Sequence, residues 1–347
     1  MIDVGVDLHK TQFTVCGLND GEEVLQKEYR TGKEGYLAFL SDLKALEVPK
    51  KKVRLAVETT GNVWHFMHVM ESHVKEVQVV NTMKFKVIVQ SSSKTDNRDA
   101  RTIAFYLWKD MLPTVTLPDA ESRKITKVVK IRSKVVGRMT SLKNEIHALY
   151  MEEGIQIKKS QLTSVKQLEA LKNTEADEHI IFLATGLIDE LIRLKKTETS
   201  LENKLKEMTA QDMGVKTLMT IPGTGIVTAC AVRGVLADIE RFDNPKKVTS
   251  YAGLAPWVSN SNETIRHGHI TKRGSNILRN ALVQMAMGMI RLWGKSQKNG
   301  SKSLGKWYRQ LASRVGGGKS KIALARRLSR IVWAMLQTNT PFRCEMI

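Results

Sequence analysis

The sequence predicts an α/β domain over residues 1–117, a helical coiled-coil segment over residues 118–212 and a mainly α-helical region over residues 213–347. Three observations lead to this division. Short apolar runs alternate with segments of helical spacing in the first part, no proline occurs between Pro118 and Pro222, and helical spacing returns after Gly214. A chain of 347 residues is long enough for two or three domains with their own cores.

The first part alternates β-type and helical segments. Residues 1–18 form a β-type run, and Asn19-Asp20-Gly21 predicts a turn into a further strand. Residues 33–46 have the apolar spacing of an amphipathic helix. Short buried strands are predicted at residues 53–57, which lead to Glu58, and at residues 77–80, which lead to Asn81. Strands separated by helices in this way indicate a central sheet with helices on its faces.

The middle segment shows the heptad spacing of a coiled coil. Apolar residues recur at alternating intervals of four and three between Val135 and Leu149, and again between Ile180 and Met208, where Glu198 interrupts the pattern once. Two helices with a break near Gly154 form either an antiparallel hairpin within the chain or a pairing with a second subunit. The sequence leaves both arrangements open.

Beyond Gly214 the chain is predicted to be helical, with two interruptions. The first is Pro222-Gly223-Thr224-Gly225, which resembles the turn of a helix-hairpin-helix, where backbone N–H groups at a helix start receive a phosphate. A tight connection between two helices explains it equally well. The second interruption is a polar loop, expected from Pro256 to Gly274.

The charge of the chain predicts a polyanionic partner. The formal net charge is +20 and the pI is about 9.8, and Lys and Arg gain binding free energy by releasing counterions from phosphates. No Asp or Glu lies between Glu263 and Glu345, and none lies between Arg123 and Lys143, where basic residues are frequent. We therefore expect a nucleic acid. A membrane is not expected, because the sequence has neither a long apolar span nor a signal peptide.

The cysteines indicate the compartment. Cys16, Cys230 and Cys344 lie far apart and lack the spacing of a zinc site or a disulfide framework. This pattern fits a reducing cytoplasm. We therefore expect a cytoplasmic protein that associates with the nucleoid when it acts.

Four acidic residues are candidates for a metal site. Asp7 lies within the first predicted strand, Glu58 ends another, and Asp96 and Asp99 begin a helix, on one face of it. A carboxylate in an apolar strand is costly to bury unless it is paired or binds a metal. Carboxylates suit Mg²⁺ (or Mn²⁺), which keeps positions for water and phosphate oxygens. Taken singly, Asp96 is also a good N-cap and Glu58 a partner for a lysine.

These acids lie in blocks that resemble a known family. The chain closely resembles the transposases of insertion-sequence family 110 in three blocks: Val4-Gly5-Val6-Asp7-Leu8-His9-Lys10, Val57-Glu58-Thr59-Thr60-Gly61 and Lys94-Thr95-Asp96-Asn97-Arg98-Asp99-Ala100. The resemblance covers nearly the whole chain apart from the coiled-coil segment. It implies a RuvC-like, RNase H-like fold for residues 1–117, with Asp7, Glu58, Asp96 and Asp99 as the Asp-Glu-Asp-Asp catalytic and metal-binding set.

The resemblance also implies a transposase domain over residues 213–347 with a serine nucleophile. A Gly-Leu-x-Pro turn at residues 253–256 and the block Ile270-Thr271-Lys272-Arg273-Gly274 are similar to that domain, and they place the family serine at Ser261. Ser259 is the alternative. The family usually has glycine after its serine, whereas this chain has Asn262. The basic residues expected to contact nucleic acid are Lys94, Arg266, Lys272, Arg273 and Arg279.

A serine hydroxyl becomes a good nucleophile only when a base or a metal activates it. Because no acid lies between Glu263 and Glu345, activation of Ser261 is expected from the N-terminal acids, as the family also implies. The leading hypothesis is a recombinase that cuts and rejoins donor and target DNA through a phosphoserine bond with Mg²⁺ assistance. The resemblance adds a structured noncoding bridge RNA as a guide. Exchange of two duplexes predicts a dimer or tetramer.

Two alternatives stay open. One is a metal-dependent, RuvC-like nuclease or junction resolvase that uses water in place of a serine. The other is a non-catalytic nucleic-acid scaffold whose acids are structural.

Overall fold

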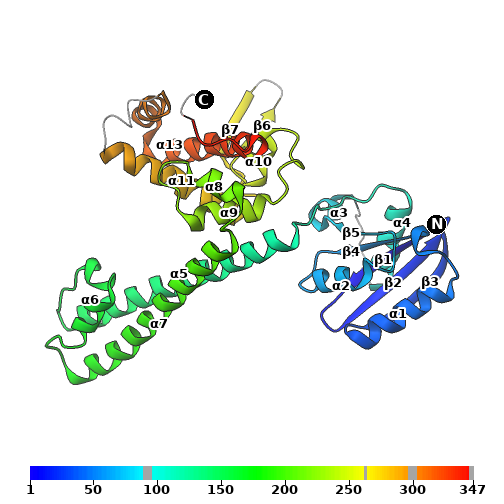
Figure 1. Cartoon of the computed structure of the whole chain (residues 1–347), viewed down its shortest axis with the longest axis horizontal. Coiled ribbons are helices and arrows are strands. Elements are labelled where there is room, and N and C mark those ends of the chain that lie inside the picture. Colours follow the sequence, from blue (N-terminus) through cyan, green and yellow to red (C-terminus); the bar gives the residue numbers. More distant parts are fainter. Residues whose placement is uncertain (89–95, 262–263, 296–302, 344–347) are drawn as a thin grey trace. The chain divides into compact units, whose positions relative to one another are not determined.

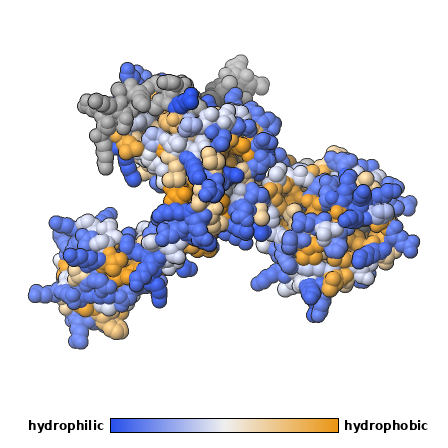
Figure 2. All heavy atoms as spheres, in the orientation of Figure 1, coloured by the Kyte–Doolittle hydropathy of each residue, from blue (hydrophilic) through white to orange (hydrophobic). Residues whose placement is uncertain are grey.

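The computed structural model describes residues 1–88, 96–261, 264–295 and 303–343, and the chain divides into two units at Leu117 and Pro118. The first unit is a mixed α/β layer structure, and the second is mostly helical (Figure 1). This confirms the predicted α/β character of the N-terminal part and the helical character of the rest. Hydrophilic side chains dominate the visible surface of each unit, and apolar patches on it are smaller (Figure 2).

The first unit is built on a five-stranded sheet in the order β3-β2-β1-β4-β5. β1 pairs antiparallel with β2, β2 pairs antiparallel with β3, and β1, β4 and β5 run parallel to one another. The bounds of the strands are β1 Ile2–Leu8, β2 Gln12–Asn19, β3 Glu22–Arg30, β4 Val53–Glu58 and β5 Glu76–Val80.

Two turns set the hairpins of this sheet. The β-type run predicted at residues 1–18 is two strands, because the chain reverses after β1, where the His9 N–H donates to the Gln12 carbonyl at 2.9 Å. The predicted turn at Asp20-Gly21 is confirmed. Both residues have positive φ, 50° and 89°, which is the backbone twist that a two-residue hairpin favours.

Helices cover both faces of the sheet. α1 (Lys33–Ala45) and α2 (Val63–Met70) bury the face that carries the even-numbered residues of β1, in a core that includes Val4, Val6 and Phe39. α4 (Asp96–Trp108) lies on the opposite face, and α3 (Thr82–Ile88) shares a core with it through Phe85 and Ile103. Since side chains alternate along a strand, the odd-numbered residues of β1 face α4.

The second unit begins with a long helical hairpin. α5 (Ala120–Glu152) and α7 (Glu178–Met208) pack against each other within one chain, along a core that runs through Met139, Ile146, Ala184 and Leu191. The turn after α5 contains Gly154, with a φ of 72°. η2 (Lys159–Leu162) and α6 (Val165–Leu171) fill the connection. Of the two arrangements left open by the sequence, the structure has the intrachain pairing.

Glu198, which interrupts the apolar seam of α7, forms an ion pair with an arginine of α5. Glu198 Oε1 lies 2.6 Å from Nη2 of Arg132 on α5, and Glu202 lies 2.8 Å from the same nitrogen. The break is therefore a half-buried ion-pair network between the two helices. It also shows that Arg132, one of the basic residues of α5, is occupied by carboxylates of the chain itself.

The remainder of the second unit packs around one apolar core. Its elements are α8 Met213–Met219, α9 Ile226–Leu236, α10 Pro245–Tyr251, β6 Pro256–Ser261, β7 Thr264–Ile270, α11 Asn276–Lys295 and α13 Ser303–Thr338. The loop predicted from Pro256 to Gly274 is wrong over most of its length, because β6 and β7 form an antiparallel hairpin there. A two-stranded ribbon needs no continuous apolar face, so its sequence lacks the alternation of apolar residues that predicts a strand.

The turn between α8 and α9 is a tight helix connection. Gly223 has a φ of 79°, and a β-carbon there would lie 2.6 Å from the backbone of Gly288 in α11. The glycine is thus required by close packing against another helix. This favours the structural interpretation of the Pro222-Gly223-Thr224-Gly225 turn over a phosphate loop. None of the helices in the described part of the chain is long and apolar enough to cross a membrane.

Candidate functional site

Two of the four predicted acids lie at the same edge of the sheet. Asp7 is near the end of β1 and Glu58 is the last residue of β4. The two strands are parallel neighbours with Val6 opposite Val57, so Asp7 and Glu58 reach the carboxyl edge together. The Asp7 side chain is 9% exposed and its Oδ2 lies 3.1 Å from Nε2 of His9. The Glu58 residue is half-buried.

The other two acids reach this edge through the direction of α4. A β-carbon on Gly5 would stand 2.1 Å from the Ala100 carbonyl oxygen, so the middle of α4 rests directly on β1. Near the other end of the helix, the Leu107 carbonyl accepts from Nη2 of Arg54 at 3.1 Å, and Arg54 is the strand partner of Asp3. α4 therefore runs antiparallel to β1. Its first turn, which contains Asp96 and Asp99, lies toward the end of β1 that carries Asp7.

The backbone thus directs the four predicted acids toward the same edge of the sheet, while the side chains are described only in part. Asp99 is half-buried, and the side chain of Asp96 lies outside the described part of the structure, as does the whole of Lys94. Among the side chains that are described, no three His, Cys, Asp or Glu are spaced to hold a metal ion. The donor set consists of carboxylates at strand ends and a helix start, which is the chemistry that suits Mg²⁺ or Mn²⁺.

Asp3 is a buried acid of the same strand that sequence reasoning passed over. It is 1% exposed, and Nε of Arg54 donates to its Oδ1 at 2.6 Å. Nη1 of Arg54 reaches Asp110 at 2.5 Å, and the hydrogen bond to Asp3, ahead of the other contacts, raises the pKa of Arg54. The negative charge of Asp3 is therefore balanced by Arg54 within the fold, whereas Asp7 is a candidate metal ligand. The sequence feature that could have indicated this ion pair is Arg54, a charged residue within the apolar run of residues 53–57.

The predicted serine lies on the β6–β7 hairpin. Ser261 is the last residue of β6 and is paired with Thr264, and the alternative, Ser259, is paired with Arg266. The hairpin places both serines within one short ribbon beside a basic residue. The side chains of residues 258–267 lie outside the described part, so the structure adds only their backbone positions.

Three hydrogen bonds fix the loop that follows this hairpin. Lys272 N donates to the Gly253 carbonyl at 3.1 Å, and Nη1 of Arg279 donates to the carbonyls of Ala252 and Lys272, both at 3.1 Å. Lys272, with a φ of 53°, and Arg273 are exposed. The exposed side chains of Lys272 and Arg273 thus lie on a loop whose backbone is held by hydrogen bonds. Arg279, which is half-buried, has at least one nitrogen committed to positioning that loop.

Trp257 is a candidate that the sequence did not single out. It is 57% exposed at the start of β6, and a β-carbon on Gly268 would come within 3.0 Å of its ring. An exposed indole beside a basic loop is suited to stack on a base. Only its exposure distinguishes it from the other tryptophans, and exposure is not visible in the sequence.

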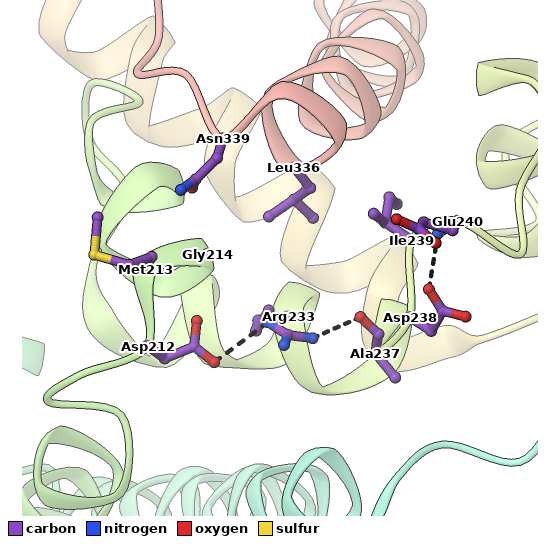
Figure 3. A pocket seen from close by; sticks show the side chains of 10 residues that line it. All are labelled: Asp212, Met213, Gly214, Arg233, Ala237, Asp238, Ile239, Glu240, Leu336 and Asn339. Carbon is purple, nitrogen blue, oxygen red and sulfur yellow. Dashed lines mark hydrogen bonds and ion pairs between the residues drawn. The ribbon is translucent and has the colours of Figure 1, made fainter.

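A pocket near α8 and α9 is distinct from the predicted site. It has a volume of about 500 Å³ and none of the predicted site residues line it. Its one arginine, Arg233, is held by Asp212 at 3.2 Å and by the Ala237 carbonyl at 2.6 Å (Figure 3). Asp238 and Glu240 also line the pocket (Figure 3). This acidic lining disfavours a phosphate ligand.

Comparisons with known proteins find matches in two parts of the chain. A family model for a transposase of the IS110 type matches residues 4–152, which include all four predicted acids. A model described as the transposase of the IS116/IS110/IS902 family matches residues 215–300, which include the serine hairpin.

Curated relatives extend over nearly the whole chain. The transposase for insertion sequence element IS1111A of Coxiella burnetii is 26% identical over 98% of this chain and 91% of its own length. The transposase for IS1328 of Yersinia enterocolitica is 24% identical over 98% of both chains. The pilin gene-inverting protein of Moraxella lacunata is 25% identical over 98% of this chain and 97% of its own. The chain belongs to the IS110 family of transposases and is a DNA transposase or recombinase.

Proposed function

We propose that this transposase cuts and rejoins DNA through a covalent phosphoserine intermediate, with Ser261 as the nucleophile and Asp7, Glu58, Asp96 and Asp99 as the ligands of Mg²⁺ (or Mn²⁺). The observation that carries the proposal is the close approach of Gly5 to Ala100, because it brings the first turn of α4 to the edge where β1 and β4 end. A RuvC-like, RNase H-like fold for the first unit is part of the same proposal.

The chemistry is a pair of phosphoryl transfers. The Ser261 oxygen attacks phosphorus, the bond from phosphorus to the leaving DNA oxygen breaks, and the serine proton passes to a base. A DNA hydroxyl from another strand then attacks the phosphoserine, releases Ser261 and restores a phosphodiester. Because the number of phosphoester bonds is unchanged, no ATP is required. A bound Mg²⁺ supplies charge stabilisation and lowers the pKa of oxygens that it contacts.

The residues of the chain divide the remaining tasks. The four acids of the first unit would hold the metal, and the stretch between Glu263 and Glu345 has no acid that could act as a base for Ser261. Lys272 and Arg273 are exposed on a tied loop and are suited to hold a phosphate. Arg266 on β7 and Lys94 are proposed as further nucleic-acid contacts.

A guide RNA and an oligomer complete the proposal. The net charge of +20 favours polyanionic partners, and membership of the family suggests a structured bridge RNA from the noncoding DNA beside the gene. Two DNA molecules exchange strands, so we propose a dimer or tetramer.

A denaturing gel with labelled donor and target DNA tests the reaction. The protein is incubated with both DNAs, Mg²⁺ and a transcript of the flanking noncoding DNA, and the mixture is then denatured. A covalent protein–DNA adduct is expected for the wild type and for Ser259→Ala, and no adduct for Ser261→Ala or Asp7→Asn. The exposed acid Asp110 provides a matched control, since Asp110→Asn should keep the adduct.

Other outcomes select the alternatives. Cleavage that survives Ser261→Ala but is lost in Asp7→Asn identifies a metal-dependent nuclease or resolvase that uses water. An adduct that Ser259→Ala abolishes moves the nucleophile to Ser259. An adduct that forms equally well without the transcript contradicts the guide RNA.

A further inference from the structure

The last helix of the chain folds back on itself. Within α13, Gly316 has a non-helical φ of 80° and ψ of 161°. Cζ of Arg327 nevertheless lies 4.7 Å from the ring centre of Trp307, although 20 residues of straight helix would extend about 30 Å. The residues before and after Gly316 are therefore two arms that pack side by side, with Leu304 and Leu328 in a common core.

Three arginines gather on the second arm, within little more than one turn. Arg330 lies four residues after Arg326 and three after Arg327, so it neighbours both of them on the helix surface. Arg330 is exposed, whereas Arg326 and Arg327 are partly buried. A cation–π contact with Trp307 helps to hold the Arg327 guanidinium in place.

The cluster lacks counter-charges within the part of the chain that the structure describes. None of its three arginines forms an ion pair there, and Nε of Arg326 is buried without a hydrogen-bond partner. Burial, and then the charge of Arg330, lower the pKa of both Arg326 and Arg327. An arginine cluster of this kind is unfavourable for the fold alone, because like charges repel and a buried donor is left unsatisfied.

We infer that Arg326, Arg327 and Arg330 form a binding site for the phosphodiester backbone of a nucleic acid, separate from the candidate serine and acidic sites. Guanidinium groups match phosphate with paired N–H donors and are weakly hydrated, so they suit a partly buried anion site. A phosphate there would offset the repulsion between the three positive charges. DNA and RNA share this chemistry, so the test treats each in turn.

The salt dependence of binding measures these phosphate interactions directly. Fluorescence anisotropy of the full chain is recorded with a labelled DNA duplex and, separately, with a labelled single-stranded RNA, over a salt series in EDTA. The test variant is Arg326→Gln/Arg327→Gln/Arg330→Gln. For each phosphate that this variant no longer neutralises, the slope of log K against log salt should become shallower by about 0.9 on duplex DNA or about 0.7 on a single strand.

A matched control removes the same charge elsewhere. Lys50, Lys51 and Lys52 are three exposed lysines of the first unit, and their triple glutamine variant lowers the net charge equally. A shallower slope on DNA alone assigns the site to DNA, on RNA alone to RNA, and on both to the shared backbone. A slope change no larger than that of the lysine variant, on both nucleic acids, overturns the inference.

Stability separates a binding site from a structural cluster. Arg330→Gln alone, at an exposed position, should weaken binding by one phosphate interaction and leave the thermal midpoint unchanged or higher at low salt, because it relieves repulsion. A lower midpoint with an unchanged slope would show that the cluster serves the fold and would also overturn the inference. EDTA keeps Ser261 chemistry out of the measurement, so either proposal can fail without the other.

Discussion

Gly5 and Ala100 approach each other at a distance that excludes any other side chain at position 5. A β-carbon on Gly5 would lie 2.1 Å from the Ala100 carbonyl oxygen and 2.4 Å from the Ala104 nitrogen. These are backbone atoms and cannot rotate away. The close approach fixes the separation of α4 from β1, and it thereby fixes where the helix turn with Asp96 and Asp99 begins relative to Asp7.

Gly5→Ala should therefore impair both stability and activity. The added methyl group must displace α4 from the sheet, which we expect to cost about 2 kcal/mol or more of unfolding free energy, within the range for overpacked cores. Adduct formation should fall more than the folded fraction does, because the acids are displaced. Urea unfolding and the gel assay on the same preparation check both parts.

Gly186→Ala is the control for this substitution. Gly186 lies within α7, and a β-carbon added there would have no neighbouring atom within 4 Å. Alanine at this position should stabilise the chain by about 0.5–1 kcal/mol through helix propensity. Equal behaviour of the two variants would mean that the close packing at Gly5 is unimportant.

Arg54→Met should strongly destabilise the first unit. It would leave the carboxylate of Asp3, which is 1% exposed, without its arginine, and breaking a buried pair in this way typically costs about 3–5 kcal/mol. The exposed partner gives the comparison: Asp110→Asn should change the unfolding free energy by less than about 1 kcal/mol. A small effect of Arg54→Met in urea unfolding would contradict the assignment of Asp3 as a neutralised structural acid.

Arg132 and Glu198 should show coupled stability effects. Arg132→Leu leaves Glu198 and Glu202 without their cation between α5 and α7, so it should destabilise the hairpin by about 1–2 kcal/mol. Adding Glu198→Leu to that variant should recover part of the loss, because it restores the apolar seam. A double-mutant cycle in thermal unfolding measures the coupling. Additive effects of the two substitutions would show that the pair does not interact.

Cys16 should make stability depend on alkaline pH. Burial, and then the charge of Glu23, raise the pKa of its thiol from 9.0 to about 12. The unfolded chain then loses the thiol proton at lower pH than the folded chain, so the contribution is intact below pH 9 and is lost between about pH 9 and 12.

The comparison with Cys16→Ala isolates this group from the tyrosines that titrate in the same range. The unfolding free energy of the wild type should fall more steeply than that of Cys16→Ala over the interval, as measured by urea titrations at several pH values. Parallel pH profiles for the two proteins would exclude the effect.

The sequence by itself predicted the elements whose residues interact mainly with near neighbours. The helix at residues 33–46, the strand that leads to Glu58, the helix that begins at Asp96 and the turn at Asp20-Gly21 depend on local periodicity and turn chemistry, and each is present. Local patterns also made the acids and the basic C-terminal region visible, since charge and spacing are properties of the chain. The polar β6–β7 hairpin was missed because it has no apolar period.

The tertiary structure decided which groups meet, since that depends on contacts between residues far apart in the chain. It pairs Asp3 with Arg54 and leaves Asp7 at the sheet edge, although both are acids of one apolar strand. It pairs Glu198 with Arg132, and it brings Arg327 to Trp307 through the bend at Gly316. A buried charge is stable only with a partner, and only the packing of distant elements determines whether that partner is present.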